Sequence, residues 1–173
     1  MQESLQSFYH SPVGWLHLKS YKENLVGLEF SAFVNESLCV KETKESSKAI
    51  MDTIKWLDIY FNGEIPTFMP QIAFQSGSSF AQEVWELLLQ IPYGTLSTYG
   101  TLAQTIAQKH KVSKMSAQAI GGAVGRNPIA IIIPCHRIIG ANKNLTGFSG
   151  GLDKKIALLN IEGVKTTELK IPK

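Results

Sequence analysis

The chain changes character near residue 75, and this change most constrains its fold. Three short extended segments come first, separated by turn-forming clusters at hairpin spacing: residues 8–10, 15–21 and 25–30. They predict a small antiparallel sheet. Later in the chain, apolar residues recur at helical spacing. The stretch 62–78 is rich in glycine and proline with little periodicity, so we assign the linker there. We expect an α+β protein with domains 1–75 and 76–173.

One helix is expected to cover a face of the predicted sheet. Ser46 or Ser47 would be its N-cap, and Asn62-Gly63 would end it. In the second domain, Ser79 and Gln82 have the spacing of a capping box and predict the start of another helix. A final helix is expected over 153–162, followed by a poorly ordered tail over 166–173.

Two short tandem helices are predicted at about 98–109 and 114–124, the second with Ser113 as N-cap. Such a pair is the outline of a helix-turn-helix, although it fits an ordinary helical hairpin at least as often. The second helix carries mostly small side chains. Small side chains suit a close approach to another surface, and the DNA minor groove is one candidate.

A cysteine with a histidine beside it stands in the run Ile133-Pro134-Cys135-His136-Arg137, after the apolar stretch 129–133. Only a thiolate is a strong nucleophile, and a neighbouring imidazole and guanidinium can lower a thiol pKa from about 8.5. Cys135 could instead be a small buried residue at the end of a strand. A strand that merely ends has no need of the flanking proline, histidine and arginine, so we expect chemistry here.

Composition narrows the setting of this chemistry. The two cysteines, Cys39 and Cys135, form no CxxC motif, and a free reactive thiol is expected in a reducing compartment such as the cytoplasm. The sequence shows neither an export signal nor an apolar run of about 18 residues, so we expect no membrane segment. The histidines and cysteines lack metal-ligand spacing, so we expect no zinc site. The net charge of +3 permits a nucleic-acid partner without demanding one.

A glycine-, asparagine- and serine-rich loop follows the cysteine, over 140–151. Loops of this composition usually only connect elements. Its closeness to Cys135 in the sequence favours a mobile wall of the same pocket.

Together, the tandem helices and four short motifs closely resemble the O6-alkylguanine-DNA alkyltransferases, also called methylated-DNA–protein-cysteine methyltransferases. The motifs are Asn127-Pro128, Ile133-Pro134-Cys135-His136-Arg137, Phe148-Ser149-Gly150-Gly151 and Glu162-Gly163. The resemblance covers about residues 78–165, and is weak before that. It implies a ribonuclease-H-like sheet and helix, followed by a winged helix-turn-helix domain.

The resemblance also implies the catalytic roles. Cys135 matches the alkyl acceptor, His136 the base linked to it, usually through a water, and Glu162 the carboxylate that orients the histidine. Tyr99 matches the phenol that donates to the guanine ring, and Asn127 matches the asparagine that ties the helix-turn-helix to the active-site turn.

Further residues match positions that contact substrate or DNA. Arg137 completes the cysteine motif with a structural pairing. The other matches are Ser116, Ala117, Gln118, Ala119, Phe148, Ser149 and Gly150. Gln118 stands where many relatives insert an arginine into the vacated base stack, and Phe148 where several have a tyrosine.

The implied activity is DNA repair by direct reversal. A single irreversible transfer would move a methyl or other alkyl group from O6-alkylguanine, and from O4-alkylthymine, to Cys135. The resemblance implies a monomer without cofactor or metal, acting on a base flipped out of double-stranded DNA bound through its minor groove. The alternatives are a cysteine hydrolase and a non-repairing alkyltransferase-like binder of damaged DNA.

Overall fold

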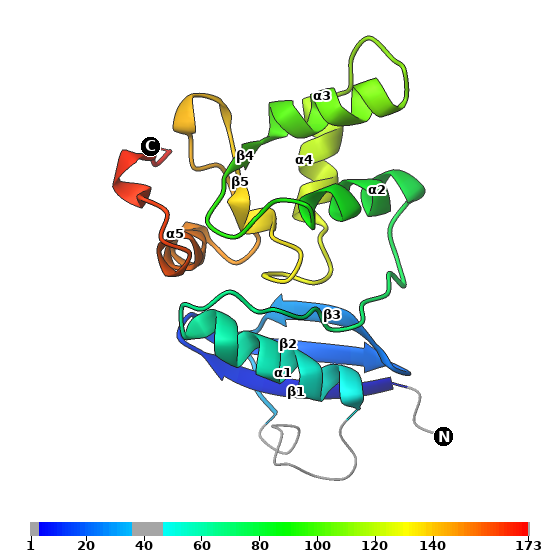
Figure 1. Cartoon of the computed structure of the whole chain (residues 1–173), viewed down its shortest axis with the longest axis vertical. Helices are drawn as coiled ribbons and strands as arrows, with labels where there is room; N and C mark the ends of the chain where they lie inside the picture. The colour runs from blue at the N-terminus through cyan, green and yellow to red at the C-terminus, as the bar shows by residue number, and fades with distance from the viewer. Residues whose placement is uncertain (1–3, 36–46, 173) are drawn as a thin grey trace. The chain divides into compact units, whose positions relative to one another are not determined.

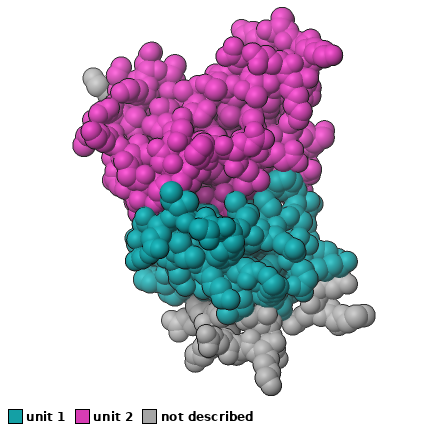
Figure 2. Space-filling view, viewed as in Figure 1, with its two compact units in different colours: residues 1–75, 128–130 teal, residues 76–127, 131–173 magenta. Residues whose placement is uncertain are grey.

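The computed structural model describes residues 4–35 and 47–172. The chain forms two compact units (Figures 1 and 2). Unit 1 comprises residues 1–75 together with 128–130, and unit 2 comprises 76–127 together with 131–173. Unit 1 is a sheet with a helix and unit 2 is mostly helical, so the α+β class is confirmed. Among the described residues, no helix is both long and apolar enough to cross a membrane.

The sheet of unit 1 is an antiparallel meander. Its strands are β1 (Ser4–Ser11), β2 (Gly14–Tyr21) and β3 (Asn24–Phe30), in the order β1-β2-β3. All three expected strands are confirmed, with longer bounds. Two distant segments pair with β3: Leu25 bridges Ile72, and Leu28 bridges Ile129. Ile72 lies in the expected linker, so part of that linker pairs with the sheet through its backbone. Side-chain periodicity does not indicate backbone pairing of this kind.

Helix α1 (Lys48–Phe61) lies across one face of this sheet (Figure 1). Ser47, one of the two predicted caps, is its N-cap and accepts a hydrogen bond from the amide of Ile50. Asn62 closes the helix, and Gly63 follows with φ +78°, a conformation that favours glycine. The buried face of α1 packs on the alternate residues of the sheet, such as Leu16 and Leu18.

Helix α2 (Ser79–Leu88) opens unit 2, but the predicted cap was wrong by one residue. Ser78, not Ser79, is the N-cap and accepts from the amide of Ala81. Both serines have cap chemistry, and the tight turn at Gly77 (φ +92°) precedes Ser78. The indole of Trp85 lies against Gly77 and donates to the carbonyl of Ala123 at 2.8 Å.

The two tandem helices are α3 (Tyr99–Lys109) and α4 (Ala117–Gly125), which pack on each other. The predicted start of the second helix was wrong by three residues. Its N-cap is Ser116, which accepts from the amide of Ala119, while Ser113 lies in the turn between the helices. The turn from the end of α3 to the start of α4 includes Lys111 at φ +55°. It is longer than the sequence predicted, so α4 begins later.

The C-terminal part of unit 2 joins a short parallel ladder to the last helix. Strand β4 (Ser97–Thr98) pairs with β5 (Ile138–Ile139), and α5 (Leu152–Ile161) follows the loop. The expectation of a poorly ordered tail was wrong for its described residues. Lys170 exchanges backbone hydrogen bonds with Lys143 and Leu145, and Leu169 packs on the apolar cluster around Leu145.

Candidate active site

The turn that presents Cys135 is built by Pro134. Pro134 has φ −82° and ψ 62°, the conformation of an inverse γ-turn, and the amide of Cys135 donates back to the carbonyl of Ile133 at 2.8 Å. Proline suits this position because its ring fixes φ near the required value. A 3-10 helix, Cys135–Arg137, follows at once. The strand end that the alternative interpretation placed at Cys135 is therefore not found.

The apolar run before the turn is buried but irregular. Ile131 has φ +70°, and its side chain is completely buried. A β-branched residue in the left-handed region is strained, by about 1–3 kcal/mol. The apolar content of this run indicates burial, but a short buried run does not define the backbone conformation.

Cys135 is 5% exposed, and its Sγ accepts a hydrogen bond from Asn127 Nδ2 at 3.1 Å. The same amide donates to the carbonyl of Ile133 at 2.8 Å, so Asn127 holds the turn and the thiol together. Burial raises the pKa of the Cys135 thiol, although the Asn127 hydrogen bond and the positive charge of Lys155 oppose this. The thiol therefore needs a base to react at neutral pH.

Glu162, at the C-terminus of α5, organises the groups behind the thiol. Its Oε1 accepts from His136 Nε2 at 2.6 Å and from Arg137 Nη2 at 3.0 Å. Its Oε2 accepts from Arg137 Nε at 2.9 Å and from the amide of Gly94 at 2.9 Å. Burial alone would raise the pKa of Glu162, but hydrogen bonds from His136 and Arg137 outweigh it and lower that pKa to about 2. The carboxylate is ionised throughout the neutral range.

His136 is fully buried, and burial lowers its pKa although Glu162 acts in the opposite direction. The imidazole is therefore neutral at pH 7. Because Nε2 donates its proton to Glu162, the other nitrogen, Nδ1, carries the lone pair of the neutral ring. A neutral histidine held in this tautomer can accept a proton.

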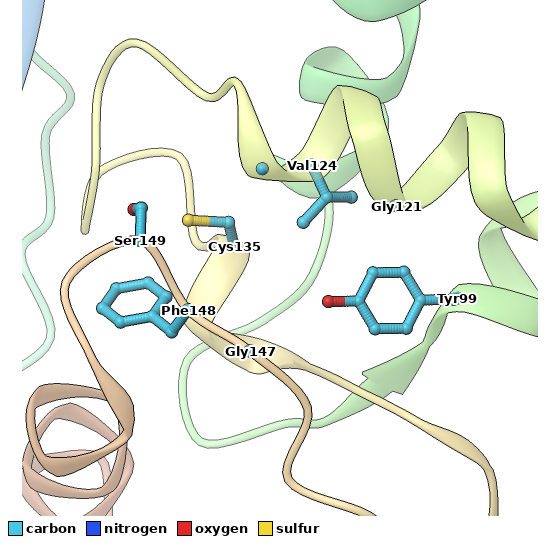
Figure 3. A pocket seen from close by; sticks show the side chains of 8 residues that line it. Tyr99, Gly121, Val124, Cys135, Gly147, Phe148 and Ser149 are labelled. Atoms are coloured by element: carbon cyan, nitrogen blue, oxygen red, sulfur yellow. The ribbon is translucent and has the colours of Figure 1, made fainter.

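A cavity of about 160 Å³ opens onto Cys135 (Figure 3). Four segments supply its walls: α3, α4, the 3-10 helix at Cys135 and the loop before α5. The lining residues are Tyr99, Gly121, Val124, Gly125, Cys135, Gly147, Phe148 and Ser149. The Tyr99 side chain points its hydroxyl toward the cysteine side of the cavity (Figure 3). The expectation that the glycine-rich loop forms a wall is confirmed.

The comparisons with known proteins agree along the chain. Residues 5–74 match the ribonuclease-like domain of 6-O-methylguanine DNA methyltransferase, and residues 79–164 match its DNA binding domain. The chain is 40% identical over 159 residues to the methylated-DNA–protein-cysteine methyltransferase of Haemophilus influenzae, covering 91% of this chain and 86% of the relative. The chain belongs to the methylated-DNA–protein-cysteine methyltransferase family.

Solved structures of relatives show the same fold. The O6-methylguanine methyltransferase of Mycobacterium tuberculosis superimposes with a TM-score of 0.74 at 35% identity, covering 92% of each chain. A structure of the Mycobacterium tuberculosis OGT in complex with DNA gives a TM-score of 0.73 at 34% identity, covering 95% of this chain and 94% of the other.

In this methyltransferase, the residues expected to contact DNA fall into two groups. Phe148 and Ser149 line the cavity, whereas Gly150 follows them in the same turn. The other group lies exposed at the start of α4, outside the cavity lining: Ser116, Ala117, Gln118 and Ala119. Arg137, which the sequence also grouped with these residues, is 7% exposed and bound to Glu162. Its guanidinium pairs with the Glu162 carboxylate, in line with the expected structural pairing.

Sequence reasoning missed several supports of the site. The Gly94 amide donates to Glu162, and Tyr93 Oη donates to the carbonyl of Ile161 at 3.0 Å, although Pro92-Tyr93-Gly94 is recognisable only as a helix terminator. Lys155 is completely buried, and burial lowers its pKa to about 8. The available signal was a lysine within the apolar stripe of the last helix, three residues after Leu152.

Cys39 lies outside the described residues. Within residues 4–35 and 47–172, no group of three or more histidine, cysteine or acidic side chains could hold a metal ion.

Proposed function

We propose that this protein repairs DNA by transferring a methyl or other alkyl group from O6 of guanine, and from O4 of thymine, to Sγ of Cys135. The observation that carries the proposal is the thiol at a cavity wall, with a neutral histidine beside it and an ionised Glu162 behind that histidine. The names of the relatives supply the substrate class, since they are methylated-DNA–protein-cysteine methyltransferases.

In the proposed reaction, His136 accepts the proton of the Cys135 thiol, through a bridging water as in the family, and Glu162 stabilises the resulting imidazolium. The thiolate attacks the sp3 carbon of the alkyl group, so an S–C bond forms and the C–O6 bond breaks. The electron pair of that bond passes to the guanine, and the Tyr99 hydroxyl supplies a proton to the departing ring. The proton that His136 accepted then restores the phenol through solvent. The product is guanine and a thioether.

A thioether is not cleaved by ordinary cellular reductants, so each protein molecule acts once. The requirement for a reduced thiol fits a cytoplasmic setting. The protein acts as a monomer on a single damaged base, and we assign residues 1–75 the role of a support domain.

DNA binding is proposed through the exposed start of α4 in the minor groove. A guanine inside a duplex cannot reach a buried thiol, so the damaged nucleotide rotates out of the stack into the cavity, at a cost of a few kcal/mol. The same helix contributes Gly121 and Val124 to the cavity and Gln118 to the exposed end. This arrangement allows one rigid element to prop the stack open and to line the base pocket.

The test is to incubate the protein with duplex DNA containing one O6-methylguanine and to analyse the recovered bases. Loss of O6-methylguanine with stoichiometric recovery of guanine is expected, and Cys135→Ser should abolish it while duplex binding remains. Retention of the damage by folded protein would favour a non-repairing binder. Turnover of activated esters without repair would favour a cysteine hydrolase.

A further inference from the structure

Thr146, in the loop between β5 and α5, is held by three separate contacts. Its Oγ1 donates a hydrogen bond to the Tyr99 hydroxyl oxygen at 3.3 Å. Its backbone carbonyl accepts from Lys155 Nζ at 3.1 Å, and the same buried ammonium donates to the carbonyl of Ile138 at 2.6 Å. Lys155 therefore ties the Thr146 backbone to strand β5.

The third contact fixes the rotamer of Thr146. A Cβ added at Gly140 would lie 2.8 Å from the Thr146 methyl carbon, so the methyl group occupies the space that the missing side chain leaves. Gly140 has φ −75°, so space and not backbone conformation makes glycine suitable here. A β-branched side chain has few χ1 options. With the methyl group packed on Gly140, the Thr146 hydroxyl is directed at Tyr99.

The direction of this hydrogen bond matters for the Tyr99 hydroxyl. A phenol has one proton, and its oxygen can accept as well as donate. Because the oxygen accepts from Thr146, the phenol proton is available to another acceptor. The hydroxyl faces the cavity that contains Cys135 (Figure 3), where the leaving base would lie. Accepting one hydrogen bond also makes a hydroxyl a better donor.

We propose that Thr146 is a positioning residue for the transfer reaction: its hydroxyl orients the Tyr99 phenol so that the phenol proton points at the departing base. The inference rests on the proposed function. A donor that is already oriented stabilises the developing charge on the base without reorganisation during the reaction. Lys155 and Gly140 act one step further back, because they hold Thr146 and not the phenol.

The test is a double-mutant cycle on single-turnover transfer from an O6-methylguanine duplex. Thr146→Val keeps the shape and removes the hydroxyl, and should slow transfer about three- to tenfold, the effect of one neutral hydrogen bond. Thr146→Ser keeps the hydroxyl and should stay within about threefold of the natural protein. In a Tyr99→Phe background, Thr146→Val should add no slowing, because no phenol oxygen remains to accept.

Gly140→Ala is a second way to disrupt the hydrogen bond from Thr146 to Tyr99. The added methyl group would displace the Thr146 methyl and turn its hydroxyl away, so slowing is expected with Tyr99 present and not in the Tyr99→Phe background. Thermal unfolding of each variant shows whether it is folded.

Three results would overturn the inference while transfer by the natural protein stands. These are an unchanged rate in Thr146→Val, equal slowing by Thr146→Val with and without the phenol hydroxyl, and an unchanged rate in Tyr99→Phe. Absence of transfer in the natural protein would instead overturn the proposed function, and the inference with it.

Discussion

Cys135 is surrounded by groups that act on its pKa in opposite directions. Burial raises that pKa, while the Asn127 amide and the Lys155 charge oppose the rise. A thiol that stays protonated is protected from stray electrophiles and oxidants, since the thiolate is the reactive form. The proposed reaction then depends on His136, which burial keeps neutral and Glu162 holds in one tautomer. The raised pKa of the thiol therefore favours the proposed proton transfer to histidine over a resident thiolate.

This organisation predicts the pH dependence of transfer. The folded pKa of His136 lies below its usual value of about 6.5, so the rate should hold down to that pH and fall only as the imidazole becomes protonated below it. Glu162 raises that pKa, so Glu162→Gln should move the fall to still lower pH and reduce the neutral-pH rate at least about tenfold.

Removing the base should change the shape of the profile. His136→Ala should lose about a hundredfold or more at neutral pH, and its residual rate should rise with pH as free thiolate forms. Single-turnover rates between about pH 5 and 9 check both variants. Glu168→Gln, which changes an exposed carboxylate paired with Lys143, is the matched control and should leave the profile unaltered. An unchanged rate in folded His136→Ala would remove histidine from the mechanism.

At the residue scale, the sequence suggested the reacting groups that we propose, whereas it did not suggest most of the residues that support them. The Pro-Cys-His-Arg run has a chemical signature, because thiol, imidazole and guanidinium are contiguous. Glu162 could be linked to it only through the family resemblance, since 26 positions separate it from His136. Gly94 carries no signature of its own, and the only signal at Lys155 was a lysine within an apolar stripe. Their partners, the Glu162 carboxylate for Gly94 and the carbonyls of Ile138 and Thr146 for Lys155, are visible only in the folded structure.

Helix α4 has two different ends. Its buried residues, Ile120, Ala123 and Val124, face unit 2, and the indole of Trp85 donates to the Ala123 carbonyl. Its first turn is exposed and carries small side chains on both sides of Gln118. The C-terminal part of α4 is held by packing, and its exposed first turn is narrow because the side chains there are small. A helix of this kind suits entry into a DNA groove.

In the proposed complex, Gln118 is the side chain in the first turn of α4 that would lie in the gap left by a flipped base. Gln118→Ala should slow repair of duplex DNA more than reaction with free O6-alkylguanine, because only the duplex requires an open stack. Gln118→Arg should tighten duplex binding and steepen its salt dependence by up to about one unit of log-log slope.

Binding isotherms at several salt concentrations and single-turnover rates on both substrates measure these effects. Gln90→Arg, which adds the same charge at an exposed position in the turn after α2, is the control for net charge alone. Equal slowing of Gln118→Ala on duplex and free base would place Gln118 in the pocket or the fold. A rate unchanged on both would mean that this helix does not hold the DNA open.

At the element scale, helices were predictable because apolar periodicity is local, whereas their first residues were less so. Ser47 was correctly proposed as a cap, but Ser78 and Ser116 replaced the expected Ser79 and Ser113. All of these serines have the same cap chemistry. The length of the preceding turn decides between them, and that length depends on tertiary packing.

At the scale of the whole molecule, one short segment belongs to a different unit from its neighbours in the sequence. Residues 128–130 pair with β3 and belong to unit 1, while the residues on either side belong to unit 2. Composition cannot reveal this pairing, because the segment and its partner strand are about a hundred positions apart. The sequence showed that the run is apolar. It did not show that Ile129 would bridge Leu28 or that Ile131, two residues later, would adopt a left-handed conformation.

The most direct test of the account is the mass of the protein after reaction. Incubation with excess duplex containing O6-methylguanine should add one methyl group per molecule and then stop, and peptide mapping should locate it on the peptide containing Cys135 and not on that containing Cys39. Cys135→Ser should gain no mass. Several turnovers per molecule, modification at Cys39 alone, or transfer that survives Cys135→Ser would contradict the account.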